Sequence, residues 1–284
     1  MRMRRWLAAL AGLLPLSVCA QSAPLWRSVD IARQLRDTQP MRVRVQYRAG
    51  RVDVRPTSEP LLYSMHLRYD ERRAVPLHHY DAEQHSVALG LESGGQSTHA
   101  MSGNREAGEL RLALPMNVPL ELDLDLGGTQ STFDLGDMSL QSVRLECGAT
   151  DATLLFSRPN RRRMRDLDIN VGAAAFSAVH LGNANADQMR IRGGVGSVDL
   201  DFSGVWTHDL AVNARLLMGS LTLRVPADVG LRLEVQRFVT GFDHPGLEKR
   251  GDAWYTPNYD SAPHKLQIHA EAAIGQIEVV TASR

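Results

Sequence analysis

The chain has 284 residues, of which 32 are Lys or Arg and 32 are Asp or Glu, so the formal net charge at pH 7 is zero. Residues 1–20 contain three arginines and no acidic residue, which leaves 29 basic and 32 acidic residues, a net charge of −3, on residues 21–284. This balance gives no reason to expect nucleic-acid binding, and the length suffices for one or two domains with a hydrophobic core.

Residues 1–20, MRMRRWLAALAGLLPLSVCA, have the layout of a secretory signal peptide, with a basic start and an apolar stretch over 6–18. The apolar stretch is shorter than the roughly 20 residues that cross a bilayer. We predict cleavage after Ala20 and export to the periplasm or cell envelope, with no transmembrane helix after signal removal. In the alternative, LSVC is a lipobox and Cys19 carries a lipid anchor, although Val18 stands where Gly, Ala or Ser is usual.

Residues 21–40 form an N-terminal segment whose stretch 29–37, VDIARQLRD, is the best candidate for a short helix. Residues 41–115 are expected to form strands and a meander, beginning with the alternating stretch MRVRVQYRAGRVDVRP. Residues 116–284 are expected to form a repetitive region with an aromatic insertion at 236–263.

The repetitive region consists of units that each contain an alternating strand, a Gly or Ala, and a second alternating strand. The openings of successive units are 21–24 residues apart and lie at Leu120, Val143, Leu167, Met189, Leu210 and Leu231. Two outlying copies start at Met41 and Lys265. A period of this length, built from two short strands, predicts an all-β, single-domain β-solenoid in which one side of each strand faces inward. Val198 and Leu200 are then expected to face the core, and Asp199 and Asp201 the solvent.

Glycines recur between the two strands of a unit, and they raise the question of a phosphate-binding loop. A phosphate loop needs a helix N-terminus after the glycines, whereas RIRGGVGSVDLDF continues as a strand. We therefore interpret Gly50, Gly194, Gly196, Gly219 and Gly275 as structural turns that allow a tight bend and close backbone contact. We predict no cofactor and no nucleotide-binding loop.

These stretches resemble the toast-rack family over about residues 40–281. YRAGRVDVRPTSEPLLYSMHLRYDERRAVPLHHYD is similar to the family's N-terminal part, the units at 167–182 and 189–204 to its repeats, and MGSLTLRVPADVGLRLEV to its late segment. Toast-rack domains are β-solenoids found in LiaF-type cell-envelope stress regulators and in candidate adhesins. The resemblance implies the fold and an envelope role, and it supplies no catalytic residue. LiaF-type regulators carry transmembrane helices before the domain, so the resemblance does not extend to signalling through a membrane kinase.

Two groups of side chains could hold a ligand. PLHHYDAEQH gathers histidines and acids from His78 to His85, but neighbouring residues of a strand point to opposite faces, so we expect a solvated meander and no metal site. An outward acidic face is the second group, and it could bind a divalent cation or a sugar. Arg144, Arg190 and Arg192 alternate into equivalent places, so partial neutralisation is expected. The carboxylates of this face are Asp123, Asp125, Asp168, Asp199 and Asp201.

Two further segments and the remaining cysteine complete the candidates. RPNRRRMRD, residues 158–166, is a basic run that we interpret as a solvated loop, with contact to phosphate headgroups as the alternative. The insertion 236–263 supplies the partner-binding candidates, which could equally cap an open end of the sheet. Cys147 lies on an alternating strand and is expected to be buried. The five partner-binding candidates are Phe238, Phe242, Trp254, Tyr255 and Tyr259.

Together these observations predict an exported, non-enzymatic interaction, scaffold or adhesin-like module of the cell envelope. Its partner would be an envelope protein or a surface polymer, and self-association is compatible with the open ends of a solenoid. One alternative is a polysaccharide or divalent-cation binder along the acidic face. A second alternative is a hydrolase or lyase of envelope polymers, for which the sequence offers no recognisable catalytic motif.

Overall fold

The computed structural model describes residues 24–93 and 108–281, and nearly all regular structure in them is β-strand. The all-β prediction is therefore confirmed, and its cause is the alternation of apolar and polar residues. Within the described residues a single 3-10 helix, η1 (Leu181–Ala184), interrupts the strands. The predicted signal peptide, with Cys19 and its alternative lipid anchor, lies outside the described residues.

The fold is built from long strands joined to a set of short ones. Eight strands are 15–18 residues long: β2 (Met41–Thr57), β7 (Pro119–Asp134), β8 (Ser139–Leu155), β9 (Met164–Val179), β10 (Ala186–Asp201), β11 (Leu210–Val225), β12 (Val229–Asp243) and β15 (His264–Thr281). The shorter strands are β1 (Trp26–Gln34), β3 (Leu61–Asp70), β4 (Ala74–Asp81), β5 (Ser86–Ser93), β6 (Glu109–Pro115), β13 (Glu248–Arg250) and β14 (Ala253–Tyr255).

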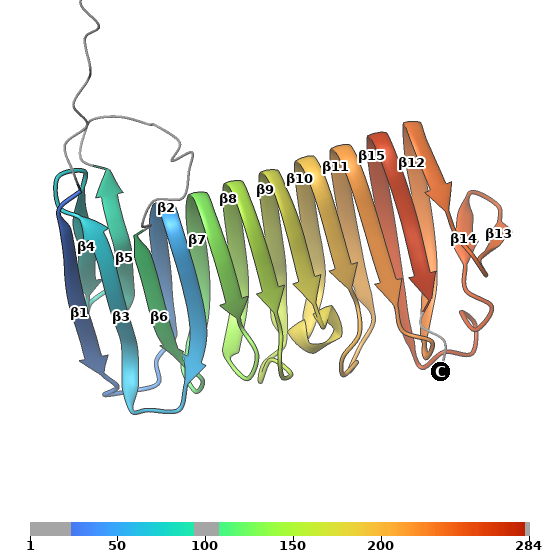
Figure 1. The fold of residues 1–284 in the computed structure, drawn as a ribbon. Coiled ribbons are helices and arrows are strands. Elements are labelled where there is room, and N and C mark those ends of the chain that lie inside the picture. Colours follow the sequence, from blue (N-terminus) through green and yellow to red (C-terminus); the bar gives the residue numbers. More distant parts are fainter. Residues whose placement is uncertain (1–23, 94–107, 282–284) are drawn as a thin grey trace, which may run out of the picture.

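Each long strand bends over at one edge of the molecule, the upper edge in Figure 1, and so has a first arm before the bend and a second arm after it. Both arms turn alternate residues toward one continuous hydrophobic core. In β10, Ile191 of the first arm and Val198 and Leu200 of the second are at most 4% exposed. Asp199 and Asp201 point outward, as predicted. Burial of these alternating apolar side chains is what holds the two arms together.

The long strands pair in parallel, in the order β2, β7, β8, β9, β10, β11, β15, β12. Chain order and spatial order differ at the end of this series, because β15, the last strand, lies between β11 and β12. Ile268 of β15 pairs with Val212 of β11 on one side and with Leu233 of β12 on the other. The outlying copy at Lys265 is therefore an internal member of the sheet.

The register differs by two residues from the alignment of unit openings at two steps. Val143 pairs with Leu122 and not with Leu120, and Met189 pairs with Val212 and not with Leu210. A register irregularity between Leu120 and Glu121 accompanies the first shift. Because side chains alternate with a period of two, a shift of two residues leaves the same faces inward. The side chains predicted to face the core and those predicted to face solvent are therefore the same after both shifts.

At the N-terminal end, short strands continue the two arms of β2 separately. The first arm pairs with β5 and the second with β6, and β4 and β3 extend these two layers. Contacts between the layers close this end: the Tyr63 hydroxyl lies 2.8 Å from His78 Nε2, and the Arg33 guanidinium lies 3.6 Å from the centre of the Tyr80 ring.

The predicted short helix over 29–37 is wrong. These residues contribute to β1, which pairs antiparallel with β3 and places Val29 and Ile31 against the core. The segment is too short for its apolar spacing to separate a helix from a strand. Pairing with β3 favours the strand, because a strand at this position forms hydrogen bonds with backbone groups of β3 that a helix would leave unpaired.

Glycines permit the close approach of neighbouring strands at the bend. Gly196, Gly219 and Gly275 pair with one another on β10, β11 and β15, and all three have φ between +132° and +138°. A Cβ on Gly219 would stand 1.7 Å from the Gly196 carbonyl oxygen. Gly50 has φ +126°, whereas Gly194 has no positive φ but lies against Gly172, whose carbonyl oxygen would be 2.3 Å from an added Cβ.

We expect Gly219→Ala to lower the free energy of unfolding by more than about 3 kcal/mol, because it combines a φ unfavourable for L-residues with a backbone clash. The matched control is Gly246→Ala, at φ +77° with no atom within 4 Å of the added Cβ, which we expect to cost about 1 kcal/mol. Chemical denaturation of both variants measures the difference. Equal losses would contradict the role of close strand contact at the bend.

Candidate functional site

The outward face of the first arms carries charges that alternate across the strands. Asp123 of β7 lies between Arg44 of β2 and Arg144 of β8 in the register, and Asp168 of β9 lies between Arg144 and Arg190 of β10. Arg44 contacts Asp123 at 3.8 Å and Arg190 contacts Asp168 at 3.4 Å. The register thus confirms that arginines partly neutralise these carboxylates. The carboxylates do not form a continuous acidic stripe on this face.

The five candidate carboxylates also lie on two different faces. Asp125 belongs to the first-arm face, where Arg48 contacts it at 3.2 Å. Asp199 and Asp201 belong to the second arm of β10, and Arg224 of β11 contacts Asp199 at 3.1 Å. Ion pairs this exposed each contribute roughly 0–1 kcal/mol. Their main effect is to leave little unpaired negative charge on the faces for which cation binding was the alternative interpretation.

The histidine segment does not form one site. His78 contacts Tyr63, and partial burial, with the nearby charge of Arg33 and the neighbouring His79, lowers the pKa of His78. His79 faces solvent, and His85 lies in the turn before β5 with φ +46°. Within residues 24–93 and 108–281, no three His, Cys, Asp or Glu side chains gather closely enough to hold a metal ion.

The basic run at 158–166 is largely paired with acids of neighbouring segments. Four of its five arginines contact a carboxylate, and Asp137 receives two of them. The Arg161 guanidinium, which bonds Asp137 at 2.7 Å, lowers the pKa of that carboxyl. The run therefore offers less free positive charge to an anionic partner than its sequence suggests. The four pairs are Arg158–Asp137, Arg161–Asp137, Arg163–Asp187 and Arg165–Glu121.

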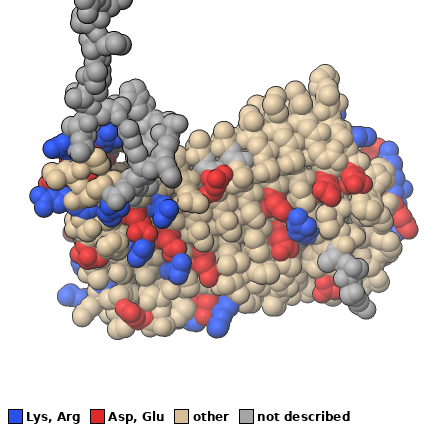
Figure 2. Space-filling view, viewed as in Figure 1, with Lys and Arg blue, Asp and Glu red and all other residues tan. Residues whose placement is uncertain are grey.

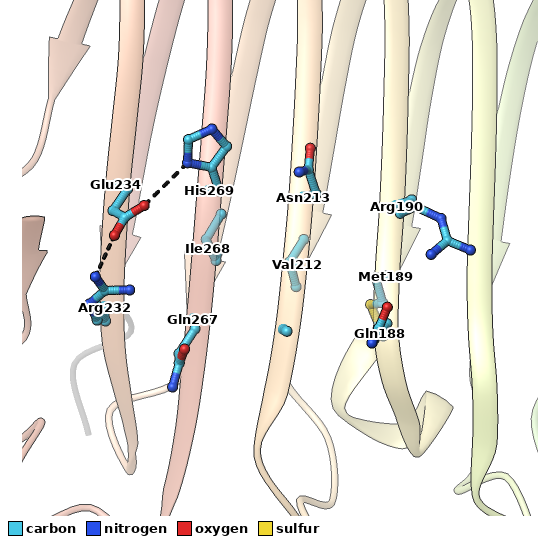
Figure 3. Close-up of a pocket in the computed structure, with 11 residues that line it drawn as sticks. Gln188, Met189, Arg190, Val212, Asn213, Arg232, Glu234, Gln267, Ile268 and His269 are labelled. Carbon is cyan, nitrogen blue, oxygen red and sulfur yellow. Dashed lines mark hydrogen bonds and ion pairs between the residues drawn. The ribbon is translucent and has the colours of Figure 1, made fainter.

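A shallow polar groove of about 320 Å³ crosses the first-arm face over β10, β11, β15 and β12 (Figure 3). The register explains it: the short side chains of Ala211 and Asn213 on β11 lie between Gln188 on β10 and Gln267 and His269 on β15. A depression forms wherever short outward side chains are flanked by long ones. Sequence reasoning missed this groove, because the residues that line it come from four strands whose order was not known.

Some polar side chains of the groove already have hydrogen-bond or ion-pair partners, and others do not. Glu234 bonds His269 at 3.3 Å and also pairs with Arg232, and Arg190 turns away toward β9 (Figure 3). Among the described residues, the side-chain amides with no hydrogen-bond partner in this groove are those of Gln188, Asn213 and Gln267. Three free amides in one open groove can each donate and accept hydrogen bonds to a ligand.

Four of the five predicted partner-binding residues pack into ring clusters at the end of the sheet. Trp254 lies 5.5 Å from Phe242 in an edge contact and 3.8 Å from His244, measured between ring centres. Tyr255 and Tyr259 form a second edge contact at 4.9 Å. These contacts, with Phe242 and Trp254 against the core, have the geometry of a cap, the alternative that the sequence left open.

The cap covers only part of the last long strand. β14 pairs with Arg232–Glu234 of β12, and the β13–β14 hairpin extends beyond it. Among the described residues, no strand pairs with the outer edge of β12 from Val235 to Asp243. Phe238 lies on this stretch and is 86% exposed. It is the one predicted partner-binding residue that the cap does not use.

Cys147 is buried in the core, as predicted. Burial raises the pKa of its thiol to about 12, so the native side chain is neutral at physiological pH. A thiol in this state is a poor nucleophile. Because the pKa rises on folding, stability is expected to fall as pH increases above the unfolded thiol's pKa.

No helix within residues 24–93 and 108–281 has the length and apolar character needed to cross a membrane. Comparison with protein families matches residues 26–165 to the N-terminal domain of toast_rack, DUF2154, and residues 178–279 to the C-terminal domain of LiaF, a cell wall-active antibiotics response protein. A search of the curated proteins found no match to this chain.

Among solved structures, a candidate cell adhesion protein from Clostridium sporogenes is 17% identical, with a TM-score of 0.48 over 92% of this chain and 100% of that one. A candidate adhesin from Bacteroides fragilis is 7% identical, with a TM-score of 0.36 over 89% and 97%. A candidate adhesin from Parabacteroides merdae is 9% identical, with a TM-score of 0.29 over 91% and 96%.

We expect Trp254→Ala to lower the free energy of unfolding by about 2–3 kcal/mol, since the half-buried ring joins Phe242 and His244 to the core. Phe238→Ala is expected to change stability by less than about 0.5 kcal/mol, because its side chain is solvent-exposed. Thermal and chemical denaturation of the two variants measure this contrast. If Trp254→Ala leaves the free energy of unfolding unchanged, the cap interpretation is wrong and Trp254 becomes a partner-binding candidate again.

Proposed function

The chain belongs to the toast-rack family, and we propose that it is an exported, non-enzymatic, adhesin-like interaction module of the periplasm or cell envelope. Its proposed partner is an envelope protein that pairs with the outer edge of β12. The observation that carries this proposal is the stretch Val235–Asp243, whose outer edge pairs with no strand among the described residues. It lies at the end of a sheet whose other long strands have neighbours on both sides. Such an edge is a template for an added strand.

We further infer that the arched strands form a β-solenoid with turns of 21–24 residues. Paired core residues support this: Leu122, Val143, Leu167, Met189 and Val212 follow one another across β7 to β11. A solenoid of this kind is stiff along its axis, because each turn is bonded to both neighbours. A partner that pairs with the terminal turn would therefore be held in a fixed orientation relative to the whole body.

Export is part of the proposal, and the sequence of residues 1–20 supports it. Cleavage after Ala20 gives a free protein, whereas cleavage before Cys19 gives a lipid-anchored one. Mass spectrometry of the protein isolated from cells separates the two, because a lipidated N-terminal cysteine adds the mass of its acyl chains. Both outcomes place the module in the envelope.

We expect a photo-crosslinking residue at Asp243 to join the protein to one dominant envelope protein in living cells. Asp243 is exposed and lies on the unpaired edge. The matched control is Thr153, an exposed residue in the same transverse row of second-arm residues, but on β8, which has neighbours on both sides. Mass spectrometry identifies the products. Equal crosslinking from both positions, or none from Asp243, would contradict pairing at this edge.

A second candidate function is polysaccharide binding, and the polar groove favours it. Amide side chains form paired hydrogen bonds with the hydroxyl groups of sugars, and three such groups in the groove have no other partner among the described residues. The candidate site thus moves from the acidic face to the groove. Arginine pairing at Asp123, Asp125 and Asp168 leaves these carboxylates less suited to a divalent cation.

For this candidate, we expect Asn213→Ala with Gln267→Ala to weaken binding to purified envelope glycans at least tenfold, since two of the three amides are lost. Gln130→Ala is the control, because Gln130 is an exposed amide on the second arm of β7. Glycan arrays and calorimetry measure binding, and product analysis tests the hydrolase or lyase alternative. Unchanged binding in the double variant would remove the groove as the site, and turnover abolished by Glu234→Gln would favour an enzyme.

A further inference from the structure

Exposed apolar side chains gather at the bends of the four strands nearest the C-terminal end of the sheet. Large apolar residues that are 40% exposed or more are few in the described residues, and six of them lie on these bends. We call this set the arch ridge. It consists of Val195 on β10, Leu217 and Met218 on β11, Ile274 on β15, and Phe238 and Val239 on β12.

The register makes these residues neighbours. Val195 pairs with Met218, Met218 with Ile274, and Ile274 with Val239. Strands in a sheet are about 4.8 Å apart, so the four form a continuous row of about 14 Å. Each is on a different strand, and paired neighbours in the row are as many as 56 residues apart in the chain. The row therefore cannot be seen in the sequence without knowledge of the pairing.

The ridge is not a general property of the bends. The corresponding residues on β9, β8 and β2 are Ala173, Ala149 and Ala49, and β7 has Gly128 at this position. Those strands have small residues at this position of the bend, whereas β10, β11, β15 and β12 have large apolar ones. Figure 2 shows the result as an uncharged upper right edge. A surface of this kind on an otherwise charged protein marks a contact region.

The charges beside the ridge differ between its two sides. On the first-arm side lie Arg192, Arg215 and Arg237; Arg192 contacts Asp168 at 3.3 Å and Arg215 contacts Glu271 at 3.1 Å. Arg237 donates a hydrogen bond to the Thr240 carbonyl oxygen and has no carboxylate partner among the described residues. On the second-arm side the nearest residues are neutral: Ser197, Ser220 and Gln276. The acids Asp199, Glu278 and Asp243 follow two residues further along their strands.

From this arrangement we infer that the arch ridge inserts into the surface of a membrane that contains anionic phospholipids. The ridge is a convex line of side-chain tips, which a flat protein surface would touch only along one row. The headgroup region of a bilayer deforms around such a line and buries all of its sides. The adjacent arginines then lie at the level of the lipid phosphates, which bind basic residues.

This inference rests on the proposed export, which brings the protein to a membrane surface, and it does not depend on pairing at β12. With the ridge at the bilayer, both arms of each strand stand away from it. The polar groove on the first arms and the second-arm part of the β12 edge remain accessible to partners from the side. Membrane contact and partner binding can then occur together.

The test is co-sedimentation of the purified exported protein with vesicles of phosphatidylglycerol and phosphatidylethanolamine, and with vesicles of phosphatidylcholine alone. We expect binding to the anionic vesicles only. Leu217→Ser with Ile274→Ser is expected to reduce this binding at least tenfold without changing the thermal melting temperature, because both side chains are exposed. Arg237→Gln is expected to reduce it severalfold and to lessen its dependence on salt.

The control is Val75→Ser with Val205→Ser, two apolar residues that are exposed to a similar degree but lie outside the ridge; its binding should equal that of the unaltered protein. Failure of the unaltered protein to bind anionic vesicles, or equal binding by the ridge variant, would overturn the inference. So would a dimer in sedimentation velocity that the ridge variant dissociates, because the ridge would then contact a second copy. Crosslinking from Asp243 is a separate readout, so the proposed function can stand or fall independently.

Discussion

The close parallel contact of arched strands at their bends is the constraint on which the rest of the structure depends. Gly219 and Gly275 bring the backbones of β10, β11 and β15 together, because a side chain on either would collide with the carbonyl group of Gly196 or Gly219 on the neighbouring strand. This contact keeps the strands in register, and the register turns every second residue of both arms toward one core. The outward rows of charges, the groove and the arch ridge all follow from the same alignment.

The surface shows a division between regular and irregular parts. Where the outward rows are regular, arginines and carboxylates alternate between strands and largely neutralise each other, so these rows mainly keep the sheet soluble. The features that suggest contacts gather at the C-terminal end, where the pattern changes. There, short residues on β11 open a groove, large apolar residues replace small ones at the bends, and the hairpin β13–β14 leaves part of β12 uncovered.

Much of the fold could be predicted from local pattern, and most of the surface could not. Alternation identified which side chains of VDLDF face inward, because that property depends only on a period of two. It could not place β15 between β11 and β12, since all the units share one pattern and none specifies its neighbour. The sequence also identified the aromatic segment but could not separate Trp254, which caps the sheet, from Phe238, which does not. The ridge left one local signal, the adjacent apolar pairs Leu217–Met218 and Phe238–Val239, which break the alternation.

The position of the last strand has a consequence for how the chain reaches this structure. β12 is synthesised before β15, yet its native neighbour along the whole of its length is β15. Until the final residues are available, the nearest long strand with a free edge for β12 is β11, whose edge β15 must later occupy. The two strands present similar apolar rows, so an early β11–β12 pair competes with the native order and must separate before folding is complete. Contacts this distant in sequence also form slowly. A chain that folds only after its synthesis is complete has β12 and β15 available together, which reduces the competition that folding during synthesis would create.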